Sequence, residues 1–250
     1  MFSMLLLAAA ATPLPPADQQ RFKDCAALAS LNPQKAVAEA EAWRSAGGGL
    51  LAKQCAGLAY VASERWPEAA AAFEQAARDA ELQRDGRAAN LWVQSGNASL
   101  ANDEAVKAKE AFDRALALPV LSDPMRGEAL MDRARASVAA DQPADARTDL
   151  DAALKLVPED PMGWLLSATL ARRQKDFPRA EQDIREAARL APTASAIAYE
   201  QGNIAYEQGQ RDVARGSWER AISLDKTGAD AGNAARMAIA KLETEAAPAR

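Results

Sequence analysis

Apolar residues recur along the chain with the spacing of one helical face. An alanine is followed four residues later by a large apolar residue and seven residues later by a second alanine. Five segments carry this pattern: Ala69, Phe73, Ala76; Ala108, Phe112, Ala115; Ala146, Leu150, Ala153; Ala180, Ile184, Ala187; and Ala214, Trp218, Ala221. Positions separated by four and seven residues lie on the same side of an α-helix. The pattern therefore predicts five amphipathic helices, each with a narrow, alanine-rich apolar stripe.

A small residue stands twelve positions before the first alanine of every segment. These small residues are Gly57, Gly96, Ala134, Ala168 and Gly202. Successive first alanines are 39, 38, 34 and 34 residues apart. Proline is tolerated at a helix start, where its missing N–H costs nothing, and it marks this position at Pro33, Pro67, Pro143 and Pro178. The chain is thus predicted to repeat a pair of antiparallel helices that approach closely at the small residue.

Two further landmarks keep the same frame. Trp92 and Trp164 lie four residues before the small residue, and Pro158 and Pro192 lie twelve residues after the first alanine. The combined pattern, W-x2-L-G-x2-Y…A-x3-F…P, resembles the tetratricopeptide repeat over roughly residues 50–225. The resemblance implies an all-α, right-handed superhelical solenoid of about six helix-turn-helix units with a C-terminal capping helix. It also implies that the two tryptophans occupy core positions.

The repeat frame predicts five parts of the chain. Residues 1–16 form a signal-peptide-like leader with a proline-rich end, and residues 17–49 form a degenerate first repeat. Residues 50–225 hold five repeats, residues 226–245 a capping helix and residues 246–250 a frayed tail.

The leader carries an apolar run from Met1 to Ala11, and Ala9–Ala11 satisfies an A-x-A cleavage pattern. The run is too short for a membrane span, which needs roughly 20 apolar residues. We therefore expect export to the periplasm or the medium and no permanent membrane span. The alternative is the apolar N-terminus of a cytoplasmic protein, because no Lys or Arg precedes the run.

Composition narrows the functional classes. The chain has 30 Lys and Arg against 35 Asp and Glu, a net charge of −5, so it offers no electrostatic reason to bind nucleic acid. It has no histidine, which removes the commonest metal ligand and general base. The carboxylate pairs Asp149–Asp151 and Glu159–Asp160 are expected in solvent-facing or turn positions. We predict a protein that is not an enzyme and that uses no cofactor or metal.

The two cysteines, Cys25 and Cys55, leave two states open: one disulfide or two buried free thiols. The resemblance places them on the first helices of the first two repeats, which are neighbours in the stack. Bridging is therefore sterically feasible without being required.

The resemblance further implies that the first helix of each repeat lines an inner groove that binds an unidentified protein or peptide. An asparagine in such a groove can donate to and accept from a peptide backbone, and an arginine can bind a carboxylate. The groove candidates are Gln54, Asn90, Asn97, Arg135, Arg172, Tyr199, Asn203 and Tyr206. We predict a protein-interaction scaffold of unknown oligomeric state. The alternatives are a self-assembling solenoid and an accessory module of a separate envelope enzyme complex.

Overall fold

The computed structural model describes residues 15–226 and 230–246 and divides the chain into two compact units, Met1–Gln142 and Pro143–Arg250. Every regular element in these residues is an α-helix, which confirms the predicted all-α repeat fold. Within the described parts of the two units the helices form five packed pairs in chain order, and the helices on either side of Gln142 belong to different units. The apolar leader run, residues 1–11, lies outside the described residues.

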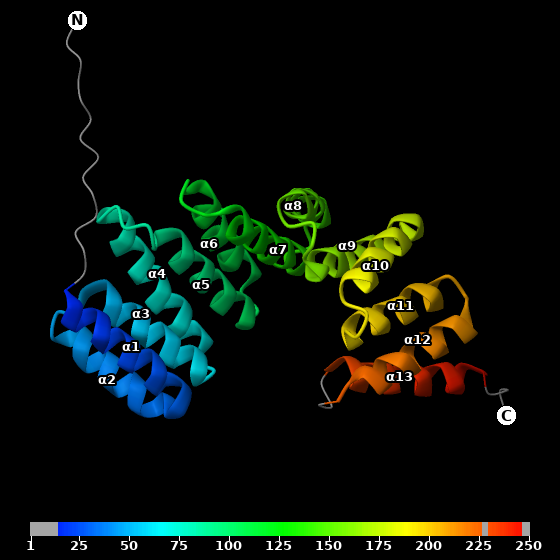
Figure 1. Cartoon of the computed structure of the whole chain (residues 1–250), viewed down its shortest axis with the longest axis horizontal. Coiled ribbons are helices and arrows are strands. Elements are labelled where there is room, and N and C mark those ends of the chain that lie inside the picture. The colour runs from blue at the N-terminus through cyan, green and yellow to red at the C-terminus, as the bar shows by residue number, and fades with distance from the viewer. Residues whose placement is uncertain (1–14, 227–229, 247–250) are drawn as a thin grey trace, which may run out of the picture. The chain divides into compact units, whose positions relative to one another are not determined.

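The N-terminal unit contains helices α1 to α7 (Figure 1). Each helix packs against the next along the chain, and α1 also packs against α3, and α5 against α7. The odd-numbered helices therefore form what we call the first-helix face of this unit. The bounds are α1 Pro16–Leu31, α2 Pro33–Ser45, α3 Gly49–Ala62, α4 Trp66–Leu82, α5 Ala88–Ala101, α6 Ala105–Ala117 and α7 Asp123–Ala139.

The C-terminal unit contains helices α8 to α13, again packed in chain order. The last helix also contacts α11, and its buried residues Ala235 and Leu242 complete the core of the final pair. This is the predicted capping helix. The bounds are α8 Pro143–Leu156, α9 Pro161–Arg173, α10 Phe177–Leu190, α11 Ser195–Glu207, α12 Arg211–Leu224 and α13 Asp230–Ala246.

The predicted apolar stripes form the core of both units. All fifteen residues of the five alanine segments are buried. Where the small residue is glycine, an aromatic ring of the paired helix occupies the space that a Cβ would need. A Cβ at Gly57 would lie 2.5 Å from Phe73, one at Gly96 would lie 2.7 Å from Phe112, and one at Gly202 would lie 2.3 Å from Trp218. The glycines therefore set the distance between paired helices.

The turns within the pairs share one backbone conformation. The residue seven positions after the small residue has a positive φ in five turns between a first and a second helix: Glu64 (55°), Asp103 (58°), Asp141 (57°), Lys175 (60°) and Gly209 (78°). A non-glycine residue in this region costs roughly 1–2 kcal/mol. Packing of the two helices therefore holds the turns at Glu64, Asp103 and Lys175 against local preference, whereas Asp141 lies next to the boundary between the two units.

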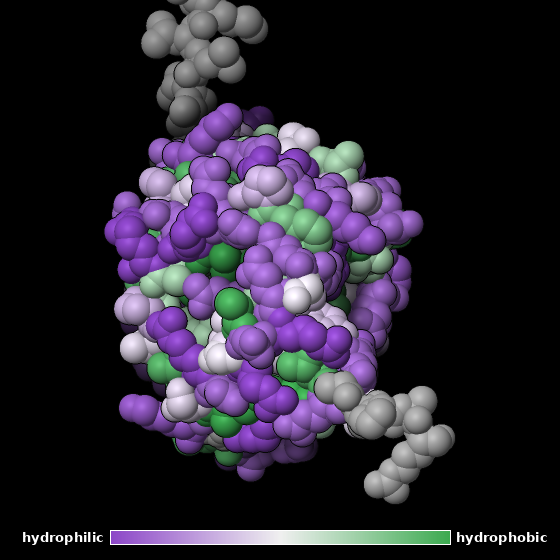
Figure 2. All heavy atoms as spheres, turned by 90° about the vertical axis from the view of Figure 1, so that its right-hand side faces the viewer, coloured by the Kyte–Doolittle hydropathy of each residue, from purple (hydrophilic) through white to green (hydrophobic). Residues whose placement is uncertain are grey.

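Few large apolar side chains of the described residues are exposed. On the face drawn in Figure 2, hydrophobic residues are scattered among hydrophilic ones. Large apolar side chains that stay exposed include Leu31, Leu82 and Met237.

Replacing Gly202 by alanine tests the close approach of α11 and α12. The new methyl group would overlap Trp218, so we expect a loss of about 1–3 kcal/mol in the free energy of unfolding. Gly216→Ala in α12 is the matched control, because a Cβ there meets nothing within 4 Å and alanine favours a helix by up to about 1 kcal/mol. Urea unfolding measures both, and equal midpoints for the two variants would contradict the packing argument.

Candidate functional site

A pocket of about 390 Å³ lies on the first-helix face of the N-terminal unit. We call it the inner-face pocket. Its lining comes from the N-terminal halves of α1 and α3 and from the start of α5: Gln19, Phe22, Lys23, Leu51, Gln54, Arg87, Asn90 and Leu91. Leu51 and Leu91 belong to the buried core beneath the pocket, and the partly buried Phe22 packs against that core and supplies its accessible apolar part.

The polar part of the pocket includes two predicted groove residues, Gln54 and Asn90. A third, Asn97, is exposed two turns further along α5. Among the residues that the structure describes, none of these three side-chain amides has a hydrogen-bond partner. Their donors and acceptors are therefore free for a ligand.

The two cations of the pocket differ in their surroundings. Arg87 donates two hydrogen bonds to the Asp85 carboxylate, at 2.9 and 2.6 Å. Lys23 is exposed and makes no ion pair within the described part of the chain. Lys23 is therefore the free positive charge at this pocket.

Arg135, the remaining groove candidate of this unit, lies on α7. It forms an exposed ion pair with Asp132 at 3.2 Å. Such a pair contributes little and can exchange for another partner. Arg135 thus keeps its charge accessible, although it is not part of the inner-face pocket.

Arg172, the first groove candidate of the C-terminal unit, is committed to internal partners. Its guanidinium donates to Glu200 at 2.6 Å and to Glu207, and its side chain is only 15% exposed. Burial lowers the pKa of Arg172, but hydrogen bonds to Glu200 and Glu207 outweigh that effect and leave the pKa raised. The geometry gives Arg172 the role of joining α9 to α11.

Asn203 and Tyr206 also have internal partners. Asn203 Nδ2 donates to Glu200 at 3.0 Å, while Asn203 Oδ1 accepts from Trp218 Nε1 at 3.1 Å. The Tyr206 hydroxyl donates to the Glu245 carboxylate of α13 at 2.8 Å. The side chain of Tyr199 packs against the core. In this unit the polar candidates therefore hold helices together.

A second internal network joins α8, α9 and α10. Arg147 donates to Ser167 Oγ at 2.6 Å and to the Ser167 carbonyl at 2.9 Å, and the Ser167 hydroxyl donates to Asp183. Burial lowers the pKa of Arg147, and the nearby Arg179 guanidinium lowers it further.

The prediction that Asp149 faces solvent was wrong. Asp149 is only 4% exposed. It lies three residues after Ala146 and one before Leu150, so helical periodicity places it on the buried face of α8.

The tryptophans lie where the repeat pattern placed them. Trp92 is 2% exposed and donates to Glu81, with the Arg78 and Arg114 guanidiniums near its ring. Trp164 is partly buried against the core of α9 and α10 and donates to the Pro158 carbonyl at 2.7 Å.

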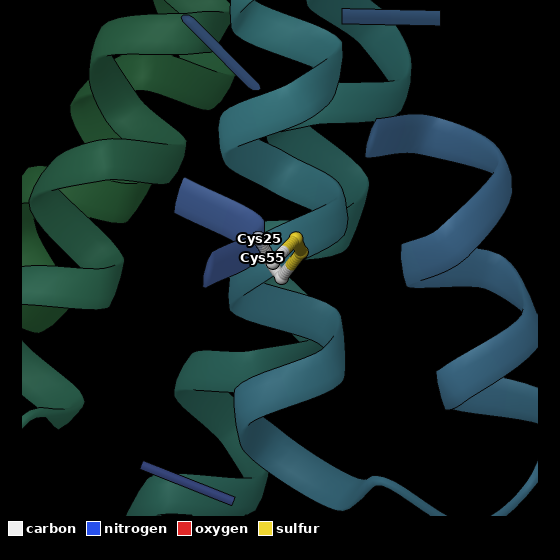
Figure 3. The surroundings of a disulfide bond; sticks show 2 residues. All are labelled: Cys25 and Cys55. Atoms are coloured by element: carbon white, nitrogen blue, oxygen red, sulfur yellow. A yellow bond between two sulfur atoms is a disulfide. The ribbon is translucent and has the colours of Figure 1, made fainter. Parts of the chain in front are cut away.

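The two cysteines form a disulfide between α1 and α3 in this structure (Figure 3). Their Cα atoms are 6.1 Å apart, and both residues are buried. Cys25 lies one turn from Phe22 and Cys55 one turn from Leu51, so the bond ties together two walls of the inner-face pocket. Only Cys25 and Ala29 are buried in α1, which makes the bond a large part of its attachment.

Across residues 15–226 and 230–246, no group of three or more Cys, Asp or Glu side chains is placed to hold a metal ion. Over the same residues, no helix combines the length and apolar character of a membrane span.

Paired helices that meet at a small residue, repeated in chain order, define a helix-turn-helix repeat protein. Residues 131–195 match the tetratricopeptide-repeat family model. The matched segment is about a quarter of the chain, and the solved structures described next share the fold of the whole array. A search of curated protein sequences finds no match.

Several solved structures share the fold. PilW, a type IV pilus biogenesis factor, aligns with a TM-score of 0.70 at 16% identity, over 87% of this chain and 97% of PilW. PilF of Pseudomonas aeruginosa aligns with a TM-score of 0.64 at 15% identity, over 85% and 95% of the two chains. YrrB, a protein with an unusual peptide-binding site, aligns with a TM-score of 0.54 at 17% identity, over 78% and 96%.

We expect the disulfide to stabilise the N-terminal unit. Closing a loop of this length contributes roughly 3 kcal/mol in the chain-entropy model. The double variant Cys25→Ala/Cys55→Ala should unfold at lower urea and be insensitive to dithiothreitol, whereas the native protein should be destabilised by it. Thiol titration of unreduced, denatured protein should find no free thiol, and finding two would rule out the bond.

Arg172→Ala should be strongly destabilising. It leaves the Glu200 carboxylate, whose side chain is 6% exposed, without its cation, and breaking such a pair costs about 3–5 kcal/mol. The neighbouring Arg173→Ala is the control, because Arg173 is exposed and has no partner among the described residues. Urea unfolding should separate the two variants clearly, and similar stabilities would show that Arg172 is not structural.

Proposed function

We propose that this protein is a non-catalytic interaction scaffold that binds an extended segment of a partner protein on the first-helix face of its N-terminal unit. The observation that carries the proposal is the inner-face pocket, where apolar core residues lie beside the unpaired amides of Gln54 and Asn90. A side-chain amide can donate to and accept from a peptide backbone at once. The shared fold of YrrB, which has a peptide-binding site, supports the same use.

The groove candidates of the C-terminal unit are not part of the proposed binding site. Arg172, Asn203 and Tyr206 are occupied by internal hydrogen bonds. A ligand would have to break these bonds before binding, which costs free energy. Binding therefore centres on Gln54, Asn90 and Asn97, with Arg135 as a further contact.

We further propose that the scaffold works in the cell envelope. A disulfide between Cys25 and Cys55 is maintained in an oxidising compartment and is rare in the cytosol of most organisms. The apolar run Met1–Ala11 fits a cleaved export signal. The fold is also that of PilW, a pilus biogenesis factor.

Affinity capture from gently cross-linked cells, read by mass spectrometry, tests the function and the compartment together. The triple variant Gln54→Ala/Asn90→Ala/Asn97→Ala should lose at least 80% of its partner, roughly a fivefold loss of binding. The control triple variant Gln34→Ala/Gln75→Ala/Gln83→Ala removes one exposed amide from α2, one from α4 and one directly after α4. This control should retain the partner.

The same spectra report the mature N-terminus. Cleavage near Ala11 and an envelope partner would support export. Partner recovery that is equal for both triple variants would contradict binding at the first-helix face, and an intact Met1 would contradict cleavage.

A further inference from the structure

The inner-face pocket has the dimensions of a binding site for part of a chain. Its volume of about 390 Å³ falls within the range of about 300–1,000 Å³ that is usual for ligand pockets. Of the three apolar side chains that line it, Leu51 and Leu91 are buried in the core, and the partly buried Phe22 supplies the accessible apolar surface. An apolar side chain that covers this surface would remove it from water, which is favourable in proportion to the area buried.

The charged side chains that line the pocket are both cations. Its lining contains Lys23 and Arg87 and no carboxylate. Other pockets of the described chain are mixed: one on α4 to α6 contains Glu74, Glu104 and Glu110 among its lining residues. The inner-face pocket is thus positive on a protein whose net charge is −5.

A carboxylate of the chain already occupies the start of α5. The Asp85 side chain accepts a hydrogen bond from the Arg87 N–H, and the Asp85 carbonyl accepts one from the Ala88 N–H. The Arg87 charge is partly used by Asp85, so Lys23 is the cation that remains for a ligand.

We propose that the pocket recognises an extended segment in which a large apolar residue stands next to an acidic one. The apolar side chain covers Phe22, the acidic side chain binds Lys23, and the amides of Gln54 and Asn90 bind the segment's backbone. This specificity rests on the proposed function, because it describes the ligand of the same face.

Fluorescent eight-residue peptides with a Gly/Ser/Thr background test the proposal against the full chain as purified from cells. Four peptides carry Leu or Ser at the centre and Asp or Lys beside it. We expect the Leu-Asp peptide to bind at least fivefold more tightly than the Ser-Asp and Leu-Lys peptides in anisotropy titrations. The preference for Asp should weaken as salt is raised.

Reversing one charge gives the decisive comparison. Lys23→Glu should reverse the flank preference, so that the Leu-Lys peptide binds more tightly than the Leu-Asp peptide. Lys35→Glu on α2 makes the same change of net charge at an exposed site away from the pocket and should keep the preference for Asp. Circular dichroism of both variants checks that each is folded.

Three results would overturn the specificity. The four peptides could bind equally or not at all, the preference could survive in Lys23→Glu, or the Leu-Asp peptide could bind only after residues 1–14 are removed. The last result would assign the pocket to the chain's own N-terminal segment. None of these removes the proposed function, which fails separately if partner capture ignores the Gln54/Asn90/Asn97 substitutions.

Discussion

The close approach of two antiparallel helices at a small residue is the constraint on which the rest of this structure depends. At Gly57, Gly96 and Gly202 an aromatic ring of the paired helix fills the space that a side chain would occupy. Dense packing of this kind stores little free volume, so it fixes the distance between paired helices. That distance in turn forces the positive φ at the equivalent turn residues, whatever their local preference.

The ends of such a repeat array need separate solutions, because a terminal helix has a neighbour on one side only. The first helix, α1, buries little of its own surface and is held by the Cys25–Cys55 disulfide. The last helix, α13, buries Ala235 and Leu242 and accepts hydrogen bonds from Tyr206 and Arg211 at Glu245. The disulfide also fixes one wall of the inner-face pocket. The stability of the N-terminal unit and the proposed binding site therefore depend on the same bond.

The two units use their first helices differently. In the N-terminal unit the amides of Gln54, Asn90 and Asn97 stay free, and the partly buried Phe22 lines the pocket over the core. In the C-terminal unit Arg172 and Asn203 bind Glu200, which is buried. A buried carboxylate needs such partners, and it therefore withdraws these side chains from ligand binding.

The sequence alone determined the helical pairs, their core and the capping helix, because these follow from a periodic pattern of small and apolar residues read within one repeat. The groove candidates came from the resemblance to the repeat family, and their role in binding stays a prediction. Only the tertiary structure decided which of them are free. Arg172 and Glu200 are 28 residues apart, and Lys23, Gln54 and Asn90 meet from three helices. Contacts between repeats depend on the stacking of helices distant in sequence, which no pattern within one repeat specifies.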